Sequence, residues 1–331
     1  MTSFERFNMA LEFKKPDRIP VCPFVMAFAA KFAGVPYSEY CTDYKKLVRA
    51  QISCVEHFEY DIVTPDTDPY RETEACGAVI EFPEDDLPVE KRPALADKKD
   101  FLKLRIPDFG SSPRLVDKIY GVEALKKATG GEIPVLGWVE APFQSASILR
   151  GLNDFMIDIY EDTDFVMDLM EFAYELAARY ALAQVEAGAH IIGIGDAVAT
   201  MVSKNTYETY AFPYTQKLVA EIQKSGAKVK YHLCGDSTHL LPLIKELKAD
   251  LVNIDSKVDL AQAREILGRT SAIKGNIDPV EILLKGDEAK VRKAAEKCIK
   301  AVPNGFMLSP GCEVPKNTPH ENMKAMVHSV R

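Results

Sequence analysis

The sequence predicts an α/β protein folded as a (β/α)8 TIM barrel, on the basis of three observations. Short apolar runs rich in β-branched residues alternate with segments whose apolar residues recur at helical spacing. Eight such runs occur within 331 residues, a length that single barrels commonly reach. Strands that alternate with helices form right-handed βαβ units and therefore a parallel sheet. We expect one barrel domain over residues 1–331, with a doubly wound open sheet as the alternative.

The runs expected to form strands are short and lie between polar segments or segments with helical periodicity. In chain order they are Arg18–Phe24, Asp61–Thr64, Ile133–Val139, His190–Gly195, Lys228–Cys234, Leu251–Asp255, Ser271–Ile277 and Gly305–Ser309.

The helical segments lie between these runs and carry recognisable end signals. The clearest ones are Asp164–Ala187, Tyr207–Lys224, Leu240–Leu247, Leu260–Leu267 and Glu288–Ala301. Asp162 and Thr163 can cap the longest of them, and Gly188 ends it.

Residues 72–110 interrupt the alternation between the second and third runs. The apolar stretch Gly77–Phe82 is followed by the polar run Pro83–Asp100, which indicates a hairpin or a long loop. We expect this insertion to cover part of the barrel mouth.

Composition excludes several classes of protein. A formal net charge of −8 and a pI near 5.4 argue against nucleic acid or an anionic membrane as the main partner. The N-terminus has no apolar signal-peptide core, and no run of 18 apolar residues can span a bilayer. Seven scattered cysteines lack the spacing of a secreted disulfide framework, so we expect a reducing, cytoplasmic location.

Soft metal ligands occur at two distant places in the chain. His232 and Cys234 are two residues apart, so they point to the same face of an extended strand, and Cys312 follows much later. An imidazole with two thiolates suits Zn²⁺, and three protein ligands leave a fourth position open, as in catalytic zinc sites. The alternative is that the cysteines are small buried apolar residues and that His232 is a packed histidine.

Polar residues recur where the predicted strands end, which is the end that carries the chemistry in barrels of this kind. They are Asp66 and Asp68, Glu140, Asp196, Asp255, Asn276 and Asp278. A carboxylate at a strand end is often only a helix cap, and Asp278 before a proline fits that role, as Asp255 also can. Glu140 lies between apolar residues, so we expect it either beside the zinc or in the substrate pocket.

Two further features have a structural alternative. Gly193 and Gly195 before Asp196 match a nucleotide-binding motif poorly, and we expect them instead to allow close approach at the barrel mouth. The apolar side chains Phe24, Met26 and Trp138 can line a pocket, although core packing explains each of them as well.

Several motifs in fixed order carry a resemblance to a known family. They are Lys15–Val21 (KPDRIPV), Glu72–Gly77 (ETEACG), Gly188–His190 (GAH), Tyr231–Gly235 (YHLCG), Lys274–Pro279 (KGNIDP), Ser309–Pro315 (SPGCEVP) and Thr318–Ala325 (TPHENMKA). With these motifs the chain resembles the uroporphyrinogen decarboxylase superfamily, and most closely its zinc-dependent, corrinoid-linked methyltransferase branch, which includes the methylcobamide:coenzyme M methyltransferases. The resemblance covers nearly the whole chain. It implies a (β/α)8 barrel in which His232, Cys234 and Cys312 bind catalytic Zn²⁺.

The chain departs from two members of this superfamily. The decarboxylases hold a polycarboxylate substrate with arginines after the first strand, whereas Val25–Lys31 here contains a single cation. Apolar side chains cannot compensate buried carboxylates, which argues against that reaction. The segment Trp138–Pro142 also differs from the coenzyme M enzymes and is similar to first-step methyltransferases that demethylate methoxy compounds.

The resemblance therefore predicts a zinc-dependent methyltransferase that moves a methyl group between a corrinoid (cobalamin) and a small molecule. The acceptor would be a thiol such as coenzyme M, or tetrahydrofolate; the alternative is a first-step enzyme that demethylates a methoxy or methylated substrate onto Co(I) corrinoid. Uroporphyrinogen decarboxylation and a non-catalytic corrinoid- or tetrapyrrole-binding barrel are further alternatives.

The expected roles divide the candidate residues into two groups. Glu140 or Asp196 would stabilise a departing oxygen as a catalytic acid. The residues expected to contact the cofactor are Asn276, Asp255, Phe24, Met26 and Trp138. Because the chain has no Asp-x-His-x-x-Gly attachment motif, the corrinoid is expected on a separate corrinoid-binding protein.

Overall fold

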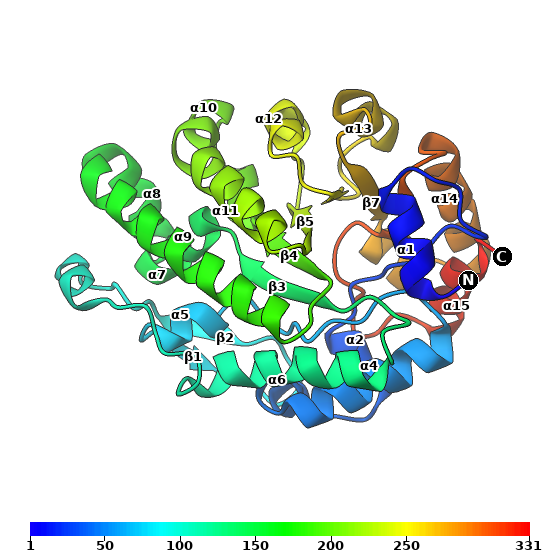
Figure 1. Cartoon of the computed structure of the whole chain (residues 1–331), viewed down its shortest axis with the longest axis horizontal. Helices are drawn as coiled ribbons and strands as arrows, with labels where there is room; N and C mark the ends of the chain where they lie inside the picture. The colour runs from blue at the N-terminus through cyan, green and yellow to red at the C-terminus, as the bar shows by residue number, and fades with distance from the viewer.

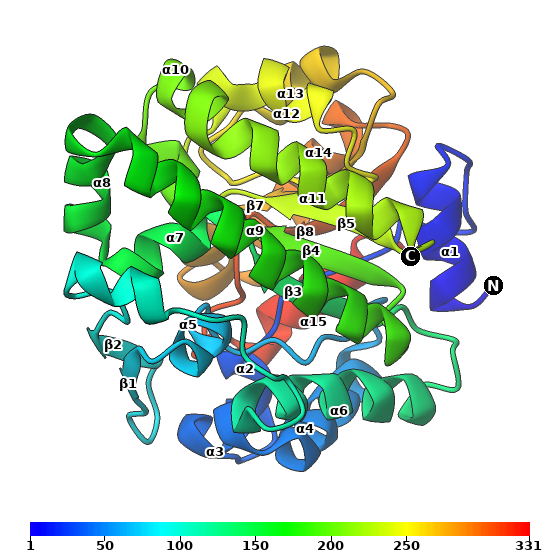
Figure 2. The same cartoon turned by 60° about the vertical axis from the view of Figure 1, so that its left-hand side comes forward.

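Six parallel strands form one sheet in the order β3–β4–β5–β6–β7–β8 in the computed structural model, which describes residues 1–331. These strands are β3 (Leu136–Glu140), β4 (Ile191–Gly195), β5 (Lys228–His232), β6 (Leu251–Asn253), β7 (Ala272–Ile277) and β8 (Phe306–Pro310). The strands lie inside and the helices surround them, as Figure 1 and Figure 2 show. This is the α/β TIM barrel predicted from the sequence.

Two extended segments occupy the places of the first two predicted strands. Val21 forms an isolated parallel bridge with Leu308 of β8, and Val63 forms one with Val135 beside β3. The backbone N–H of Asp61 donates to the carbonyl of Val21 at 2.7 Å, which joins the two segments to each other. Eight segments are therefore linked in a ring by backbone hydrogen bonds.

The expectation of regular strands over Arg18–Phe24 and Asp61–Thr64 was wrong in detail, because only isolated bridges form there. Pro20 and Pro23 have no N–H to donate to a ladder, so the first segment cannot pair continuously. Proline has the same effect on the third run, where Pro134 lies within the predicted range and β3 begins only at Leu136.

A buried carboxylate fixes the two irregular segments. Asp61 has no exposed surface and accepts hydrogen bonds from Arg6 Nη1 (2.8 Å), Arg18 Nη1 (2.6 Å) and the backbone N–H of Val21 (2.8 Å). Two guanidinium groups and one amide satisfy a charge that would be costly to bury alone. Side-chain contacts thus replace the missing ladder hydrogen bonds between these segments.

The helices follow the order that the alternation predicted. They are α1 (Ser3–Leu11), α2 (Ala27–Phe32), α3 (Tyr37–Thr42), α4 (Tyr44–Phe58), α5 (Arg71–Ala75), α6 (Pro113–Ala128), α7 (Pro142–Arg150), α8 (Leu152–Glu161), α9 (Thr163–Glu186), α10 (Lys204–Thr206), α11 (Phe212–Lys224), α12 (Leu241–Glu246), α13 (Leu260–Leu267), α14 (Glu288–Ala301) and α15 (His320–His328). Short 3-10 or π turns are η1 (Lys98–Lys103), η2 (Ala197–Met201), η3 (Tyr207–Ala211), η4 (Thr238–Leu240) and η5 (Pro279–Leu284). The Asp162 side chain accepts from the backbone N–H of Phe165 (3.2 Å), which confirms it as the N-cap of α9.

The predicted insertion contains a hairpin of β1 (Val79–Glu81) and β2 (Val89–Arg92), paired antiparallel. The chain beyond the hairpin packs against the helices that follow β3. The Leu95 N–H donates to the carbonyl of Leu149 (2.8 Å), and Lys98 lies 2.6 Å from an Asp158 carboxylate oxygen. Both views place the hairpin near α5 and α7, at the end of the barrel where the strands terminate (Figure 1, Figure 2).

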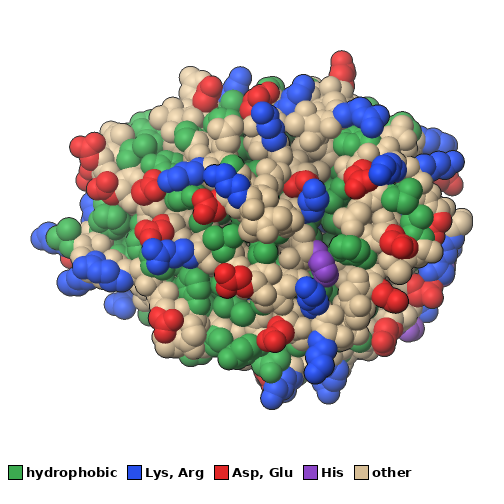
Figure 3. All heavy atoms as spheres, viewed as in Figure 1, with side chains coloured by type: hydrophobic (Ala, Val, Ile, Leu, Met, Phe, Trp, Pro, Cys, Tyr) green, Lys and Arg blue, Asp and Glu red, His purple; other side chains and the backbone are tan.

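Charged side chains of both signs are intermixed over most of the face shown in Figure 3. No helix combines the length and the apolar character needed to cross a bilayer.

Candidate metal centre at the barrel mouth

Three soft donors meet at the carboxyl end of the sheet. His232 Nε2 lies 3.1 Å from Cys234 Sγ, Cys234 Sγ lies 3.3 Å from Cys312 Sγ, and Cys312 Sγ lies 3.8 Å from His232 Nε2. The three ligand atoms all lie within 4.8 Å of one another, and no other histidine, cysteine or carboxylate belongs to the group. Donors bound to one tetrahedral Zn²⁺ are about 3.5–3.8 Å apart, given Zn–S and Zn–N bonds of about 2.3 and 2.0–2.1 Å. The donor set and its spacing therefore fit a zinc ion.

Two strands and their following turns position these donors. His232 is the last residue of β5, and Gly235 after the second donor has a φ of +91°, a conformation that favours glycine. The Thr200 hydroxyl donates to the Cys234 carbonyl at 2.9 Å and holds this turn.

The third donor follows β8 through Gly311. A Cβ at Gly311 would lie 2.4 Å from the backbone nitrogen of Ser256, so only glycine allows this approach. Asn253 of β6 donates its side-chain N–H to the Gly311 carbonyl (3.0 Å) and fixes the turn that carries Cys312.

Electrostatics favour the protonation states that a metal requires. Burial lowers the pKa of His232, which keeps the imidazole neutral and its nitrogen available. A hydrogen bond from Cys234 lowers the pKa of Cys312 to about 3, while the same contact and burial raise the pKa of Cys234. The two sulfurs thus share one proton, and a metal that replaced this proton would bind both as thiolates.

Aromatic side chains form a wall beside the donors. Trp138 of β3 stacks on Phe24 with ring centroids 4.9 Å apart and lies 6.1 Å from the His232 ring. A Cβ at Gly193 would lie 2.2 Å from Trp138 Cε3, and one at Gly195 would lie 2.7 Å from Trp138 Cζ2. The two glycines of β4 therefore make room for the indole. This agrees with the prediction that they allow close approach at the barrel mouth.

Glu140 lies next to this wall but is not a member of the donor group. Its Oε1 accepts a hydrogen bond from Trp138 Nε1 at 2.7 Å, and its backbone N–H donates to Glu72 Oε1 at 3.3 Å. Burial, with the nearby Glu72 and Asp66, raises the pKa of Glu140 well above its ordinary value. The shift favours the protonated form of the carboxyl group, which is the form that can donate a proton.

The Asp196 backbone N–H donates to the His232 carbonyl at 2.9 Å, but the Asp196 carboxylate is not in the donor group. Its Oδ2 accepts from the Tyr231 hydroxyl at 2.8 Å. Tyr231 neighbours His232 on β5 and so points to the opposite face of the strand. The catalytic role expected for Asp196 has no support from its position.

Three of the other predicted residues have structural contacts. The Asn276 amide donates to the carbonyls of Asp255 (3.1 Å) and Val258 (2.8 Å), which turns it toward the loop after β6. Asp255 Oδ1 accepts from the Lys257 N–H (2.9 Å), a local turn of the kind expected for a cap. Met26 is buried at the start of α2. None of these contacts places a polar group of Asn276 or Asp255 among the metal donors.

Lys230 was missed by the sequence analysis. It lies two residues before His232 on β5, so the alternation of side chains places both on the same, inner face. The same alternation was applied to His232 and Cys234, and extending it by one step identifies this lysine.

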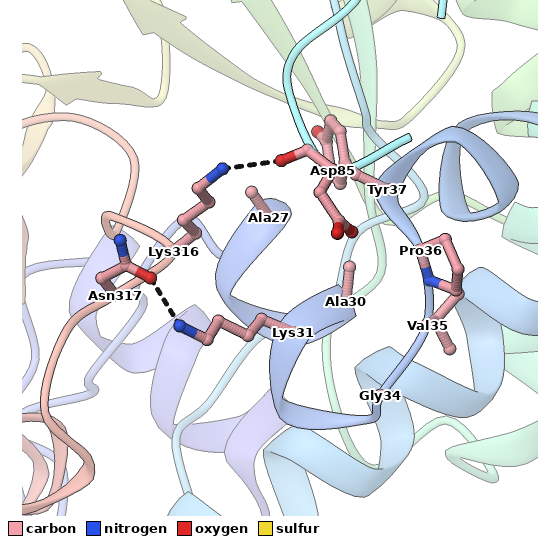
Figure 4. A pocket seen from close by; sticks show the side chains of 10 residues that line it. All are labelled: Ala27, Ala30, Lys31, Gly34, Val35, Pro36, Tyr37, Asp85, Lys316 and Asn317. Atoms are coloured by element: carbon pink, nitrogen blue, oxygen red, sulfur yellow. Dashed lines mark hydrogen bonds between the residues drawn. The ribbon is translucent and has the colours of Figure 1, made fainter. Parts of the chain in front are cut away.

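A separate cavity of about 420 Å³ is lined by α2, Asp85 and the chain at Lys316 and Asn317, and none of the three donors lines it. Figure 4 shows it between α2, the hairpin loop at Asp85 and the chain around Lys316. Lys31 Nζ donates to Asn317 Oδ1 (2.5 Å), and Lys316 Nζ donates to the Asp85 carbonyl (2.6 Å). Lys31 is the single cation in Val25–Lys31, and its ammonium group is already hydrogen-bonded at the edge of this cavity.

The sequence model of the uroporphyrinogen decarboxylase (URO-D) family matches residues 2–331. The chain belongs to the URO-D family. Among its relatives, the methylcobamide:CoM methyltransferase MtbA of Methanosarcina mazei is 26% identical over 336 residues, which cover 100% of this chain and 98% of that protein. A uroporphyrinogen decarboxylase of Trichlorobacter lovleyi is 30% identical over 278 residues, covering 82% of this chain and 77% of that protein.

The solved structures support the fold. A methyltransferase from Methanosarcina mazei superposes with a TM-score of 0.92 at 23% identity and covers 99% of this chain and 98% of its own. The chain therefore shares the fold of that methyltransferase over nearly its whole length.

Proposed function

We propose that this URO-D family member is a zinc-dependent methyltransferase that moves a methyl group between a corrinoid and a small molecule. The single observation that carries the proposal is the convergence of His232, Cys234 and Cys312, which supplies an imidazole and two cysteine sulfurs at the barrel mouth. The full-length relatives named methylcobamide:CoM methyltransferase support the same reaction class.

The residues around the donors define what the protein contributes. When bound, zinc would supply Lewis acidity that lowers the pKa of a thiol ligand or polarises an oxygen. The stacked rings of Phe24 and Trp138 provide an apolar wall that keeps water from one side of the site. The corrinoid, as methyl donor or acceptor, would be presented at the mouth by a separate corrinoid-binding protein.

The identity of the small molecule determines the direction in which the methyl group is transferred. With a thiol such as coenzyme M, or with tetrahydrofolate, the small molecule accepts the methyl group. Glu140 gives a specific reason to keep the demethylation alternative, because a buried carboxyl beside Trp138, with its pKa raised by burial, can give a proton to a departing oxygen.

Porphyrinogen decarboxylation has less support in the contacts of this chain. Residues 25–31 contain one cation, Lys31, whose ammonium group already donates to Asn317 at the surface. A polycarboxylate substrate would find no arginine in this segment.

Metal analysis tests the proposal directly. We expect about one zinc per chain, lost in Cys234→Ala and in Cys312→Ala. Cys76→Ala is the matched control, because Cys76 is also half-buried but lies outside the donor group. A folded wild-type protein that cannot bind zinc would refute the proposal.

A spectroscopic assay then decides the direction. Methylcobalamin with candidate thiols or tetrahydrofolate should yield Co(I) if the small molecule is the acceptor. Co(I) corrinoid with methoxy aromatics should yield methyl–Co(III) if the enzyme demethylates. If the protein binds zinc but the corrinoid spectrum changes in neither assay, the proposed methyl transfer is refuted.

A further inference from the structure

The third metal donor depends on a turn, whereas the other two are close together on one strand and its extension. His232 is the last residue of β5, and Cys234 follows it by two residues. Cys312 comes after β8, two residues beyond the last strand residue, Pro310. The distance from Cys312 to the other donors is therefore set by the contacts that hold the turn at Gly311.

Three contacts surround this turn. The Gly311 N–H donates to the Ile277 carbonyl at the end of β7 (2.9 Å). On another side the turn packs against the loop after β6, where a Cβ at Gly311 would lie 2.4 Å from the Ser256 nitrogen. The carbonyl of the buried Gly311 accepts from Asn253 Nδ2 (3.0 Å). This last contact is the one that a side chain supplies, and a buried carbonyl without a partner is costly.

Asn253 lies in the same register row as the first metal donor. His232 of β5 pairs with Asn253 of β6, which pairs with Lys274 of β7. Residues paired side by side in a parallel sheet point to the same face, so all three side chains lie on the inner face. Asn253 is 2% exposed and Lys274 is 1% exposed.

Lys274 fixes the orientation of the Asn253 amide. Lys274 Nζ donates to Asn253 Oδ1 at 2.7 Å, while Asn253 Nδ2 faces the Gly311 carbonyl. A peptide carbonyl can only accept, so reversing the amide would set two oxygens against each other and break both hydrogen bonds. The two contacts therefore hold Asn253 in one orientation and extend from β7 through β6 to the turn after β8.

We propose that Asn253, held by Lys274, is a positioning residue that sets Cys312 at the distance from the other two donors that one metal ion requires. The inference rests on the proposed function, since it concerns the metal centre of that reaction. Replacing a residue that orients a metal ligand commonly lowers metal affinity by about 10–100-fold. The same role gives a reason for a lysine in a barrel interior, which is normally filled with branched apolar side chains.

A zinc titration against a chromophoric chelator measures the effect. Asn253→Leu removes the donor to Gly311 with a side chain of similar size and should weaken zinc binding about 10–100-fold. Asn322→Leu is the matched control, because Asn322 is also buried and its Nδ2 donates to the carbonyls of Leu283 (3.0 Å) and Gly286 (2.9 Å), outside the donor group. Below the unfolding temperature of every variant, this control should bind zinc as the wild type does.

Cobalt in place of zinc shows which donor is affected. Thiolates bound to Co²⁺ give charge-transfer absorption in the near ultraviolet, and its intensity increases with the number of bound sulfurs. Cys312→Ala supplies the reference for a single bound thiolate. Asn253→Leu should shift from the wild-type intensity towards this reference, whereas Asn322→Leu should keep the wild-type intensity. A loss of stability alone does not change this spectrum in the folded protein.

A double variant separates positioning from stability. Asn253→Leu leaves Lys274 without its acceptor, and an unpaired buried donor lowers stability. Asn253→Leu combined with Lys274→Met replaces both polar side chains by apolar ones of similar shape, which recovers much of that loss. The double variant should fold and still bind zinc about 10–100-fold more weakly, because the Gly311 carbonyl lacks its donor.

Zinc affinity within about twofold of the wild type in the double variant would overturn the inference. An equal loss of affinity in Asn322→Leu would overturn it as well, because the effect would then be one of general stability. In both cases the wild type still binds zinc, and the methyltransferase proposal stands. Failure of the proposed function would instead appear as a folded wild-type protein that binds no metal.

Discussion

A methyl group added at Gly193 is expected to displace the indole that forms the wall of the site. The added Cβ would lie 2.2 Å from Trp138 Cε3 and 2.6 Å from Cζ3, closer than non-bonded atoms approach. The indole is buried against Phe24, so it cannot simply rotate into solvent. Moving it would also break the 2.7 Å hydrogen bond from Trp138 Nε1 to Glu140.

The expected loss of stability has two parts, the overpacking at Trp138 and the broken hydrogen bond to Glu140. Overpacking of a closely packed interior costs about 1–3 kcal/mol, and a buried hydrogen bond left unmade costs about 1–3 kcal/mol. Gly193→Ala should therefore lower the free energy of unfolding by roughly 2–6 kcal/mol. With an unfolding entropy of about 0.7 kcal/mol/K for a chain of this length, the unfolding temperature should fall by roughly 3–9 °C.

Thermal denaturation combined with tryptophan fluorescence measures this effect. The emission of Trp138 should change in the folded state, because both its stacking and its hydrogen bond change. Gly110→Ala is the control, since a Cβ there would meet only Asp108 Oδ1, at 3.8 Å. If Gly193→Ala unfolds at the wild-type temperature with unchanged emission, the assigned packing between β3 and β4 is incorrect.

Two further variants test the buried carboxylates. Asp61→Asn should lower the free energy of unfolding, measured by urea denaturation, by about 3–5 kcal/mol. The reason is that the buried Arg6 and the partly buried Arg18 lose the negative charge that they share. A loss below about 1 kcal/mol would contradict this role of Asp61. Burial raises the pKa of Asp196 to about 7, so its contribution to stability is greatest below the unfolded value near 4 and is lost as the pH rises to about 7. Asp196→Asn should retain the hydrogen bond from Tyr231. It should also make the unfolding temperature depend less on pH between about 4 and 7. If the variant changes the unfolding temperature by the same amount at every pH, Asp196 does not titrate in this range.

The convergence of His232, Cys234 and Cys312 was predictable because it follows from a local rule. His232 and Cys234 share a strand face by alternation, and Cys312 follows another strand of the same parallel sheet, so both places lie at one end of the barrel. The hairpin within residues 72–110 was predictable for a similar reason, since an apolar stretch and a polar run alternate over a short distance.

Position at a strand end does not reveal which way a side chain points. Asn276 and Asp196 satisfied the same rule as Glu140, yet their hydrogen bonds go to the loop after β6 and to Tyr231, respectively. The regularity of a strand is also not local. Pro20 and Pro23 restrict pairing in the first segment, and its place in the ring depends on Asp61, more than thirty residues later.

The separation of the donors along the chain has a consequence for assembly of the protein. Cys234 and Cys312 are 78 residues apart, with β6 and β7 between the strands that carry them. An ion held by both residues would act as a cross-link, and closing a loop of this length in the unfolded chain corresponds to about 4.5 kcal/mol on chain-entropy grounds. A polypeptide still lacking its final strand could not offer all three donors. Loading of the centre would therefore mark the moment at which the last strand has docked and would make its later detachment more difficult.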